Sequence, residues 1–307
     1  MEKKVIEEHN KESQAFWEKK AALYSKFISV ENIPIMAALS SLSKVSTSKS
    51  ILEVGCGSGE GTKYLTLQSQ SPSIIYGLDF SETMISLSME NFKNFENFNS
   101  NTKNSYEKIT NDSAKSRIIV PNHIEKGTHI KLIQGDCENL PFEDEQFDSY
   151  VSSLCLHLTK DYPKALREAY RVLKKGGHFS LAIWGKRSLT NLRMIEDICD
   201  QFGLEVKMLK NYKMGEDEKK LILTCEEIGF QKVRVSYSNI IRNIESKEVY
   251  YMKFFDESLK LQIEEIKKKN PEKGKEIELA IEKKVTTFFD VEKNVPVMNI
   301  LYLFGQK

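Results

Sequence analysis

The chain has 307 residues, and its 45 Lys and Arg residues are balanced by 44 Asp and Glu residues, which leaves a formal net charge of +1. A chain of this length can bury a full α/β core, and the near-neutral balance disfavours a dedicated nucleic-acid-binding protein. Because no apolar run is long enough to span a membrane and the N-terminal segment lacks the features of a signal or transit peptide, we expect neither a membrane span nor a targeting segment.

Short apolar runs alternate with amphipathic segments from about residue 49 to residue 240. Their periodicity and capping residues distinguish the predicted strands from the predicted helices. Alternation of this kind predicts a mostly parallel sheet that is covered by helices. In chain order we expect strands at residues 50–54, 73–78, 129–134, 147–154 and 179–184, helices at 60–67, after Ser81 and at 162–174, and a further helix and sixth strand within 221–235.

Three segments lie outside this predicted core. The N-terminal segment has apolar positions at helical spacing, and the segment between the second and third strands is rich in Asn, Ser and Lys, which is typical of an inserted surface loop. Near the C-terminus, two charged helical stretches are broken at Asn270-Pro271. We interpret the whole chain, 1–307, as one domain with a helical lid at 1–48, a core at 49–240, an inserted loop at 92–127, a helical cap at 241–292 and a final strand in 293–307.

The five cysteines are isolated, with no CxxC pair and no histidine at the spacing of a metal site. This pattern predicts reduced thiols in a cytoplasmic protein, with no bound metal.

Residues 51–61, ILEVGCGSGEG, place four glycines within seven positions directly after the first predicted strand. In a parallel sheet, ligands bind beyond the carboxyl ends of the strands, and glycines there let a ligand approach the backbone closely. A dinucleotide-binding loop would have the spacing GxGxxG, but Glu60 stands where its third glycine is required. The spacing therefore disfavours an NAD-dependent dehydrogenase.

The pattern E-x-G-x-G-x-G, from Glu53 to Gly59, resembles motif I of the class I S-adenosylmethionine (SAM)-dependent methyltransferases. Further stretches match this family in the correct order: YGLD, which ends at Asp79, then GDC around Asp136, LPFEDEQFDSYVSSLCLHL and RVLKKGGHFSLAIWG. The resemblance covers roughly residues 15–240 and 295–307, and it is to the broad group that includes ubiquinone-type and small-molecule methyltransferases. It implies a Rossmann-like, seven-stranded, mostly parallel sheet with helices on both faces and a helical cap.

The resemblance also implies where SAM binds. The glycines would admit its methionine and ribose portions, Asp79 would accept hydrogen bonds from both ribose hydroxyls, and Phe80 would cover one face of adenine. The carboxylate of Asp136 would accept the adenine amino group. The implied cofactor-binding residues are Glu53, Gly55, Cys56, Gly57, Gly59, Asp79, Phe80, Met84, Asp136, Cys137 and Ser153.

The implied reaction transfers the methyl group of SAM to a small-molecule or lipid-like acceptor and leaves S-adenosylhomocysteine (SAH). Signatures of adenine, cytosine and arginine methylation are absent from the sequence. Quinone methyltransferases carry Glu-x-Ser where this chain has Ile183-Trp184-Gly185, which disfavours a quinone acceptor. The alternative is a catalytically silent methyltransferase fold that serves as a scaffold, although the intact glycine motif argues against it. No pattern specifies the acceptor atom or an oligomeric state.

A further prediction concerns a catalytic pair, His157 and Tyr24. His157 follows the fourth strand of the core, and such a histidine resembles the one that pairs with an entry-helix tyrosine in some small-molecule methyltransferases. Imidazole titrates near neutrality, so it could take a proton from the acceptor while the phenol orients it. The alternative is a histidine that is packed under the following helix for structural reasons.

Overall fold

The chain forms two compact units in the computed structural model. The first comprises Met1–Ile183, Glu218–Ser236 and Tyr302–Lys307, and the second comprises Trp184–Asp217 and Tyr237–Leu301. The second unit therefore holds the predicted cap together with the segment from Trp184 to Asp217. The residues that the structure describes are 15, 17–22, 24–25, 29–69, 72–99, 116–119, 128–191, 194–204, 212–255 and 257–307.

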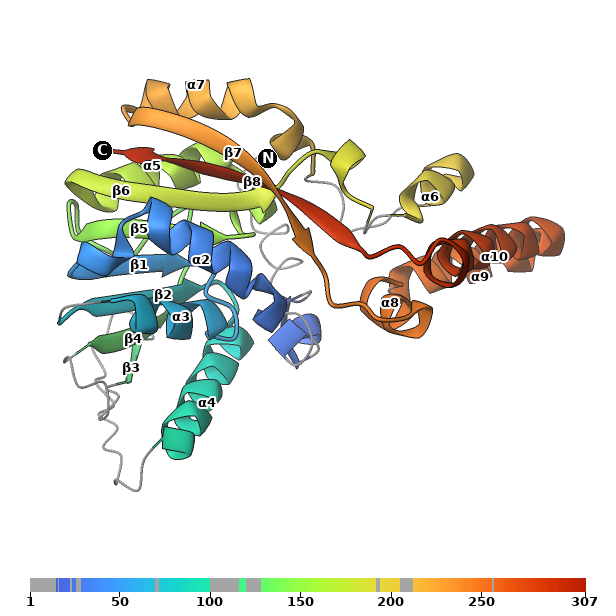
Figure 1. The fold of residues 1–307 in the computed structure, drawn as a ribbon, viewed down its shortest axis with the longest axis horizontal. Coiled ribbons are helices and arrows are strands. Elements are labelled where there is room, and N and C mark those ends of the chain that lie inside the picture. The colour runs from blue at the N-terminus through green and yellow to red at the C-terminus, as the bar shows by residue number, and fades with distance from the viewer. Residues whose placement is uncertain are drawn as a thin grey trace. The chain divides into compact units, whose positions relative to one another are not determined.

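One mixed, mostly parallel sheet organises the fold, with the strand order β3-β4-β2-β1-β5-β6-β8-β7 (Figure 1). β1 pairs in parallel with β2 on one side and with β5 on the other. The strand order therefore changes direction at β1, because β2 and β4 extend the sheet on one side of it and β5 and β6 on the other. Ligands bind at such a switch point, beyond the carboxyl ends of the strands. The strands are β1 (Ser50–Val54), β2 (Ile74–Asp79), β3 (Ser116–Ile119), β4 (His129–Gln134), β5 (Phe147–Ser153), β6 (Leu173–Trp184), β7 (Gln231–Ile241) and β8 (Val297–Gln306).

The predicted Rossmann-like sheet is confirmed, and β3 adds an eighth strand at its edge. β3 pairs antiparallel with β4, with Ser116 opposite Ile133. It lies inside the segment 92–127, for which we predict a loop. That prediction is wrong for these four residues and for residues 92–99, which form the end of the helix α4 (Glu82–Asn99). The backbone of β4 offers an unpaired edge there, and the β-branched Ile118 and Ile119 suit a short strand that pairs with it. Residues 100–115 and 120–127 of the predicted loop lie outside the described residues.

Helices cover both faces of the sheet in the first unit. α2 and α3 lie in front of it in the view of Figure 1, and α5 lies behind. The Asp161 side chain, directly before the helix predicted at 162–174, caps α5 by accepting a hydrogen bond from the Lys164 N–H at 2.9 Å. The helices of this unit are α2 (Ile33–Leu42), α3 (Glu60–Gln68), α4 (Glu82–Asn99), α5 (Tyr162–Val172) and α7 (Glu218–Ile228).

The end of α5 differs from the prediction of a helix over residues 162–174. The helix ends at Val172, and Leu173 already pairs with Phe147 as the first residue of β6. The backbone prefers this pairing because it satisfies its hydrogen-bonding groups in the sheet, where the Lys174 ammonium also meets Asp148 at 2.8 Å. Gly176, with φ +78°, therefore serves an irregularity within the strand and not a helix cap.

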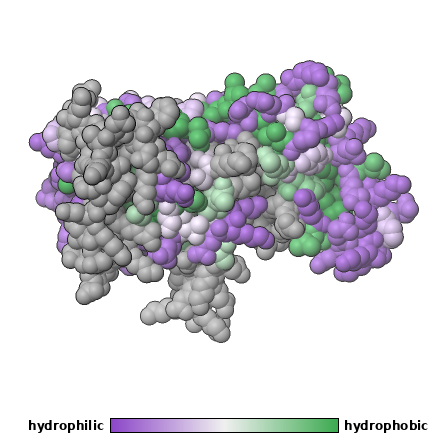
Figure 2. Space-filling view, turned by 90° about the horizontal axis from the view of Figure 1, so that it is seen from below, coloured by the Kyte–Doolittle hydropathy of each residue, from purple (hydrophilic) through white to green (hydrophobic). Residues whose placement is uncertain are grey.

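The second unit is mainly helical. Asn270 caps the last helix by accepting a hydrogen bond from the Lys273 N–H at 3.1 Å, and Pro271 occupies the first helical position, which confirms the predicted break. Much of the surface seen in Figure 2 is hydrophilic, with smaller hydrophobic areas between. Within the described ranges, no helix combines the length and apolar character needed to cross a membrane. The helices are α6 (Glu196–Phe202), α8 (Lys247–Phe254), α9 (Glu257–Lys269) and α10 (Pro271–Thr286).

Candidate functional site

A cavity of about 110 Å³ opens beyond the carboxyl ends of β1, β2, β4 and β5, within the first unit. Eight of the eleven predicted cofactor-binding residues line it, namely Gly55, Gly57, Asp79, Phe80, Met84, Asp136, Cys137 and Ser153. Glu53 and Cys56 line a smaller neighbouring cavity of about 30 Å³, which shares Gly55 and Ser153 with the first. Gly59 lines neither of these two cavities. The sheet thus gathers residues from four separate stretches of the chain into one place.

Asp79 ties the glycine loop to the end of β2. Its Oδ2 accepts a hydrogen bond from the Gly57 N–H at 2.8 Å, and its Oδ1 accepts one from the Ser81 N–H at 2.9 Å. Burial raises the pKa of Asp79, and these backbone donors oppose that rise. Each carboxylate oxygen has a second lone pair, so two further donors from a ligand can be accepted at the cavity side.

The three motif glycines all have positive φ, but a side chain at each would meet something different. A Cβ on Gly55 (φ +75°) would lie 2.6 Å from the Cys155 Cβ, and a Cβ on Gly59 (φ +89°) would collide with Ser88. A Cβ on Gly57 (φ +54°) would lie 3.3 Å from the Tyr24 ring at the cavity wall. Close packing of neighbouring chain segments therefore explains Gly55 and Gly59, whereas Gly57 keeps the cavity open.

Glu53 lies beneath the glycine loop and is only 2% exposed. The Thr62 hydroxyl donates a hydrogen bond to its Oε2 at 2.5 Å. Burial raises the pKa of Glu53 to about 8, although the hydrogen bond from Thr62 opposes the rise. A carboxyl group in this state is mostly protonated at neutral pH, and a nearby cation would favour its ionised form.

The wall formed by the loops after β4 and β5 carries a serine and two thiols. The Ser153 Oγ is buried and makes no hydrogen bond with any residue in the described part of the chain, so a polar group from a ligand would satisfy it. The Cys137 and Cys155 thiols meet at the same wall. A hydrogen bond with Cys155, together with burial, raises the pKa of Cys137 well above its usual range. The residues with determined positions contain no group of three or more His, Cys, Asp or Glu side chains that could hold a metal ion.

The structure brings one member of the predicted catalytic pair to the cavity. Tyr24 lines both cavities, and its hydroxyl accepts a hydrogen bond from the Asn32 amide at 2.9 Å. His157 lies in a short 3₁₀ turn, Leu156–Leu158, and is 5% exposed. It is not among the described residues that line the cavity, and burial lowers its pKa to about 3. The structure therefore supports the structural role of His157 over the catalytic one.

Family models decide what kind of protein forms this cavity. A methyltransferase-domain model matches residues 52–181, from β1 into β6, and a second methyltransferase-domain model matches residues 121–293. The second match alone spans more than half of the chain. The chain belongs to the class I SAM-dependent methyltransferases. The resemblance noted from motif I is thereby confirmed, and SAM is the cofactor of this family.

Named relatives of this methyltransferase align with its core. The ubiquinone/menaquinone biosynthesis C-methyltransferase UbiE of Brucella canis is 31% identical over 139 residues, which are 39% of this chain and 50% of that enzyme. The phthiotriol/phenolphthiotriol dimycocerosates methyltransferase of Mycobacterium leprae is 31% identical over 134 residues, 44% of this chain and 37% of that one. The match thus spans half or less of these relatives. The structure of the YcgJ protein of Bacillus subtilis shares the fold, with a TM-score of 0.51 and 15% identity over 90% of this chain and 97% of that one.

The cavity of the methyltransferase also has lining residues that the sequence analysis did not assign. Glu138 and Cys155 directly follow predicted site residues or strand ends, so their position next to the motifs could have indicated them. Trp17 lies with Tyr24 in the stretch FWEKKAALYSKF, which resembles the entry helix of the family, so its place in that stretch could also have indicated it. Its ring meets the ring of Tyr24 edge to face, with centroids 5.7 Å apart.

We expect His157→Ala to lower stability by about 2–4 kcal/mol, as large-to-small substitutions of buried residues do, while the affinity for SAM stays within about twofold of the wild type. The folded-state pKa of about 3 lies below the usual 6.5, so the neutral histidine stabilises the fold fully above pH 6.5 and progressively less as the pH falls toward 3. Between pH 7 and pH 5 this linkage amounts to about 2 kcal/mol. Denaturant unfolding at both pH values should show a smaller pH dependence in the variant.

A catalytic His157 would behave in the opposite way. The variant would then keep the stability of the wild type and bind SAM normally, but it would lose turnover.

Proposed function

We propose that this protein transfers the methyl group of SAM to a small-molecule or lipid-like acceptor, with SAM held in the 110 Å³ cavity. The observation that carries the proposal is the carboxylate of Asp79, which is half-buried at the cavity wall and hydrogen-bonded to the N–H of Gly57. A half-buried carboxylate and a side-chain-free backbone segment together suit a ribose with two adjacent hydroxyls. The names of the Brucella and Mycobacterium relatives, which refer to quinone biosynthesis and to dimycocerosates, support an acceptor of lipid-like character.

The residues of this chain can be assigned to the parts of the cofactor. Asp79 would hold the ribose hydroxyls, Asp136 the adenine amino group, and Phe80 one face of the base. Glu53, in the smaller adjoining cavity, would face the ammonium group of the methionine portion, whose charge would favour the ionised carboxylate. Ser153 would gain the hydrogen bond that it lacks within the described chain.

When bound, SAM supplies a methyl carbon on a positively charged sulfur, from which an attacking acceptor displaces SAH as the leaving group. The protein's contribution is the alignment of acceptor and methyl group, which can lower the barrier substantially by itself. Trp17 and Tyr24 give the cavity an aromatic wall against which an apolar acceptor can pack. His157 is not assigned the role of a base in this proposal. We further infer a cytoplasmic protein, because all five cysteines carry thiols.

A calorimetric titration separates this proposal from its alternatives. We expect SAM and SAH each to bind with a stoichiometry of one per chain and a dissociation constant in the micromolar range, about −8 kcal/mol. NAD serves as the control ligand and should give no binding heat, because the loop lacks the glycine spacing that a pyrophosphate requires. A folded protein that binds neither SAM nor SAH would be a scaffold and would overturn the proposal.

A further inference from the structure

The turn that follows β4 carries Asp136, and it is built to hold this side chain in one orientation. The Glu138 N–H donates a hydrogen bond to the Asp136 Oδ1 at 2.9 Å, and the Asn139 N–H donates one to the Asp136 carbonyl oxygen at 3.0 Å. Asp136 and Glu138 both line the cavity. One oxygen of the Asp136 carboxylate is therefore committed to the turn, and the turn's position determines where the carboxylate lies.

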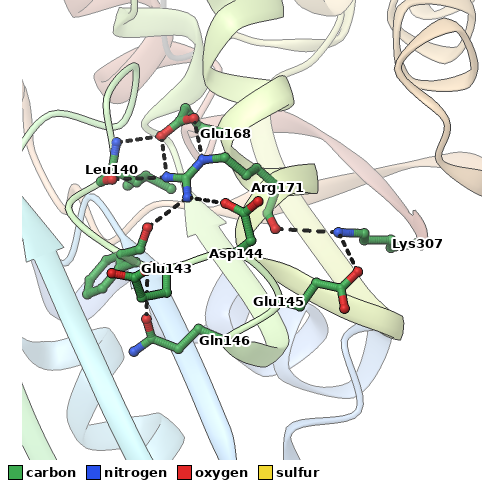
Figure 3. A network of polar contacts seen from close by, with 9 residues as sticks. Leu140, Glu143, Asp144, Glu145, Gln146, Glu168, Arg171 and Lys307 are labelled. Carbon is green, nitrogen blue, oxygen red and sulfur yellow. Dashed lines mark hydrogen bonds and ion pairs between the residues drawn. The ribbon is translucent and has the colours of Figure 1, made fainter.

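Arg171 of α5 clamps the chain directly after this turn (Figure 3). Its guanidinium donates hydrogen bonds to the carbonyl oxygens of Leu140 at 3.0 Å and Phe142 at 2.7 Å, and to the Asp144 carboxylate at 2.8 Å. Two further donors engage Glu168, each at 2.8 Å, and Glu168 in turn accepts the Leu140 N–H at 2.7 Å. Both backbone polar groups of Leu140 are thus held by one Arg–Glu pair.

The charge state of this pair favours a rigid clamp. Burial opposes ionisation of Glu168, but the hydrogen bonds from Arg171 and Leu140 outweigh it and lower the pKa of Glu168. The planar guanidinium presents its donors in a fixed fork, so it can hold several acceptors at once in a defined geometry. A lysine at the same position would carry the charge but could not reach all of these acceptors together.

The other side of the turn is tied to the beginning of the same helix. The Glu138 Oε1 accepts hydrogen bonds from the Lys160 N–H at 2.7 Å and the Asp161 N–H at 3.1 Å, directly before α5. A carboxylate is favourable at a helix N-terminus, where the backbone N–H groups are unpaired. α5 therefore holds the turn at two places, through Glu138 near its first residue and through Arg171 in its last turn.

We propose that Arg171, with Glu168, is a positioning residue that gives the protein its selectivity for an adenine base over a base with a carbonyl oxygen in place of the amino group. This inference rests on the proposed function, in which Asp136 accepts the adenine amino group. A carbonyl oxygen there would face the carboxylate, and no hydrogen bond could form because both groups are acceptors. A site that hydrogen-bonds one group rejects an analogue that lacks this group. The rejection requires that the carboxylate cannot turn away, which the clamp ensures.

The test compares two ligands that differ only at this edge of the base: SAH and S-inosylhomocysteine, in which a carbonyl oxygen replaces the amino group and the adjacent N1 carries a proton. We expect the wild type to prefer SAH by at least about tenfold in calorimetric titration. In Arg171→Gln the preference should fall at least threefold. Arg171→Lys, which keeps the charge, should also show a smaller preference for SAH. It can be measured in place of Arg171→Gln if that variant does not fold.

Arg167→Gln is the matched control. It removes the same charge from the same helix, but Arg167 only approaches Asp161 at 4.0 Å on an exposed surface, where an ion pair contributes little. We expect this variant to keep the wild-type preference for SAH.

Three results would overturn the inference, and they differ from one another. If the wild type binds neither ligand, both the proposed function and this inference are wrong. If the wild type binds SAH and its inosine counterpart equally, Asp136 does not distinguish the amino group from the carbonyl oxygen. Arg171 variants that weaken both ligands by the same factor, and so retain the preference, show that the clamp is structural only.

Discussion

Gly57→Val is expected to abolish SAM binding, with a loss of affinity greater than a hundredfold. Gly57 has φ +54°, a conformation that is strongly unfavourable for a β-branched residue. Its Cβ would already lie 3.3 Å from the Tyr24 ring, and the two methyl groups of valine would occupy the cavity wall itself. A shift of the loop to relieve this crowding would also break the hydrogen bond from the Gly57 N–H to Asp79. Calorimetry with SAM measures the effect.

Gly203→Val is the control that tests the unfavourable backbone conformation alone, without crowding in the cavity. Gly203 ends α6 with φ +70°, and a Cβ there would have no atom within 4 Å. This variant should lose stability for the same conformational reason but should bind SAM like the wild type. If folded Gly57→Val also binds SAM normally, the glycine loop is only a turn and the cofactor lies elsewhere.

Asp79→Ala is expected to weaken SAM binding by on the order of tenfold to a hundredfold. Hydrogen bonds to a charged group contribute about 1.5–3 kcal/mol, and each 1.4 kcal/mol corresponds to a factor of ten. The variant also leaves the N–H groups of Gly57 and Ser81 without their acceptor, so we expect a lower melting temperature as well. Asp79→Asn should be intermediate, because the amide keeps one acceptor oxygen.

The structure offers a matched control for the expected loss of melting temperature in Asp79→Ala. Asp148 also accepts two backbone N–H groups, from Lys49 at 3.0 Å and Ser50 at 2.9 Å, but at the amino end of β1, away from the cavity. Asp148→Ala should therefore lower the melting temperature and leave the affinity for SAM unchanged. Equal losses of SAM affinity in the two variants would show that Asp79 acts through stability and not through contact with the ribose.

Local signals in the sequence were sufficient for many of the helices and strands. The cap at Asp161, the proline at the start of α10 and the apolar runs of the strands depend on near neighbours in the chain, so they can be predicted without a structure. The glycine spacing after β1 and the acids after β2 and β4 predicted where a site would form. The topology rule for parallel sheets then brought these stretches together, since their strands end at the same edge.

Side-chain directions in loops depend on distant contacts and could not be predicted in this way. Leu154 has φ +54°, which is rare for a residue other than glycine, and it turns the chain directly after β5. No local pattern indicates such a conformation, so the sequence could not show that His157 would be buried away from the cavity. The edge strand β3 is a different case, because Ile118 and Ile119 are a local strand signal that the polar composition of the surrounding segment obscured.

The sequence by itself thus determined the family, the parallel core and eight of the residues that line the cavity, because periodicity, capping and glycine spacing are local. The tertiary structure alone decided which of those residues are held by which others. Gly55 and Gly59 are glycines because Cys155 and Ser88 pack against them. Arg171 lies 35 positions after Asp136, and it acts on this part of the cavity only because α5 folds back against the turn. Such contacts join residues that are distant in the sequence and are brought together by tertiary packing, so the sequence alone does not show them.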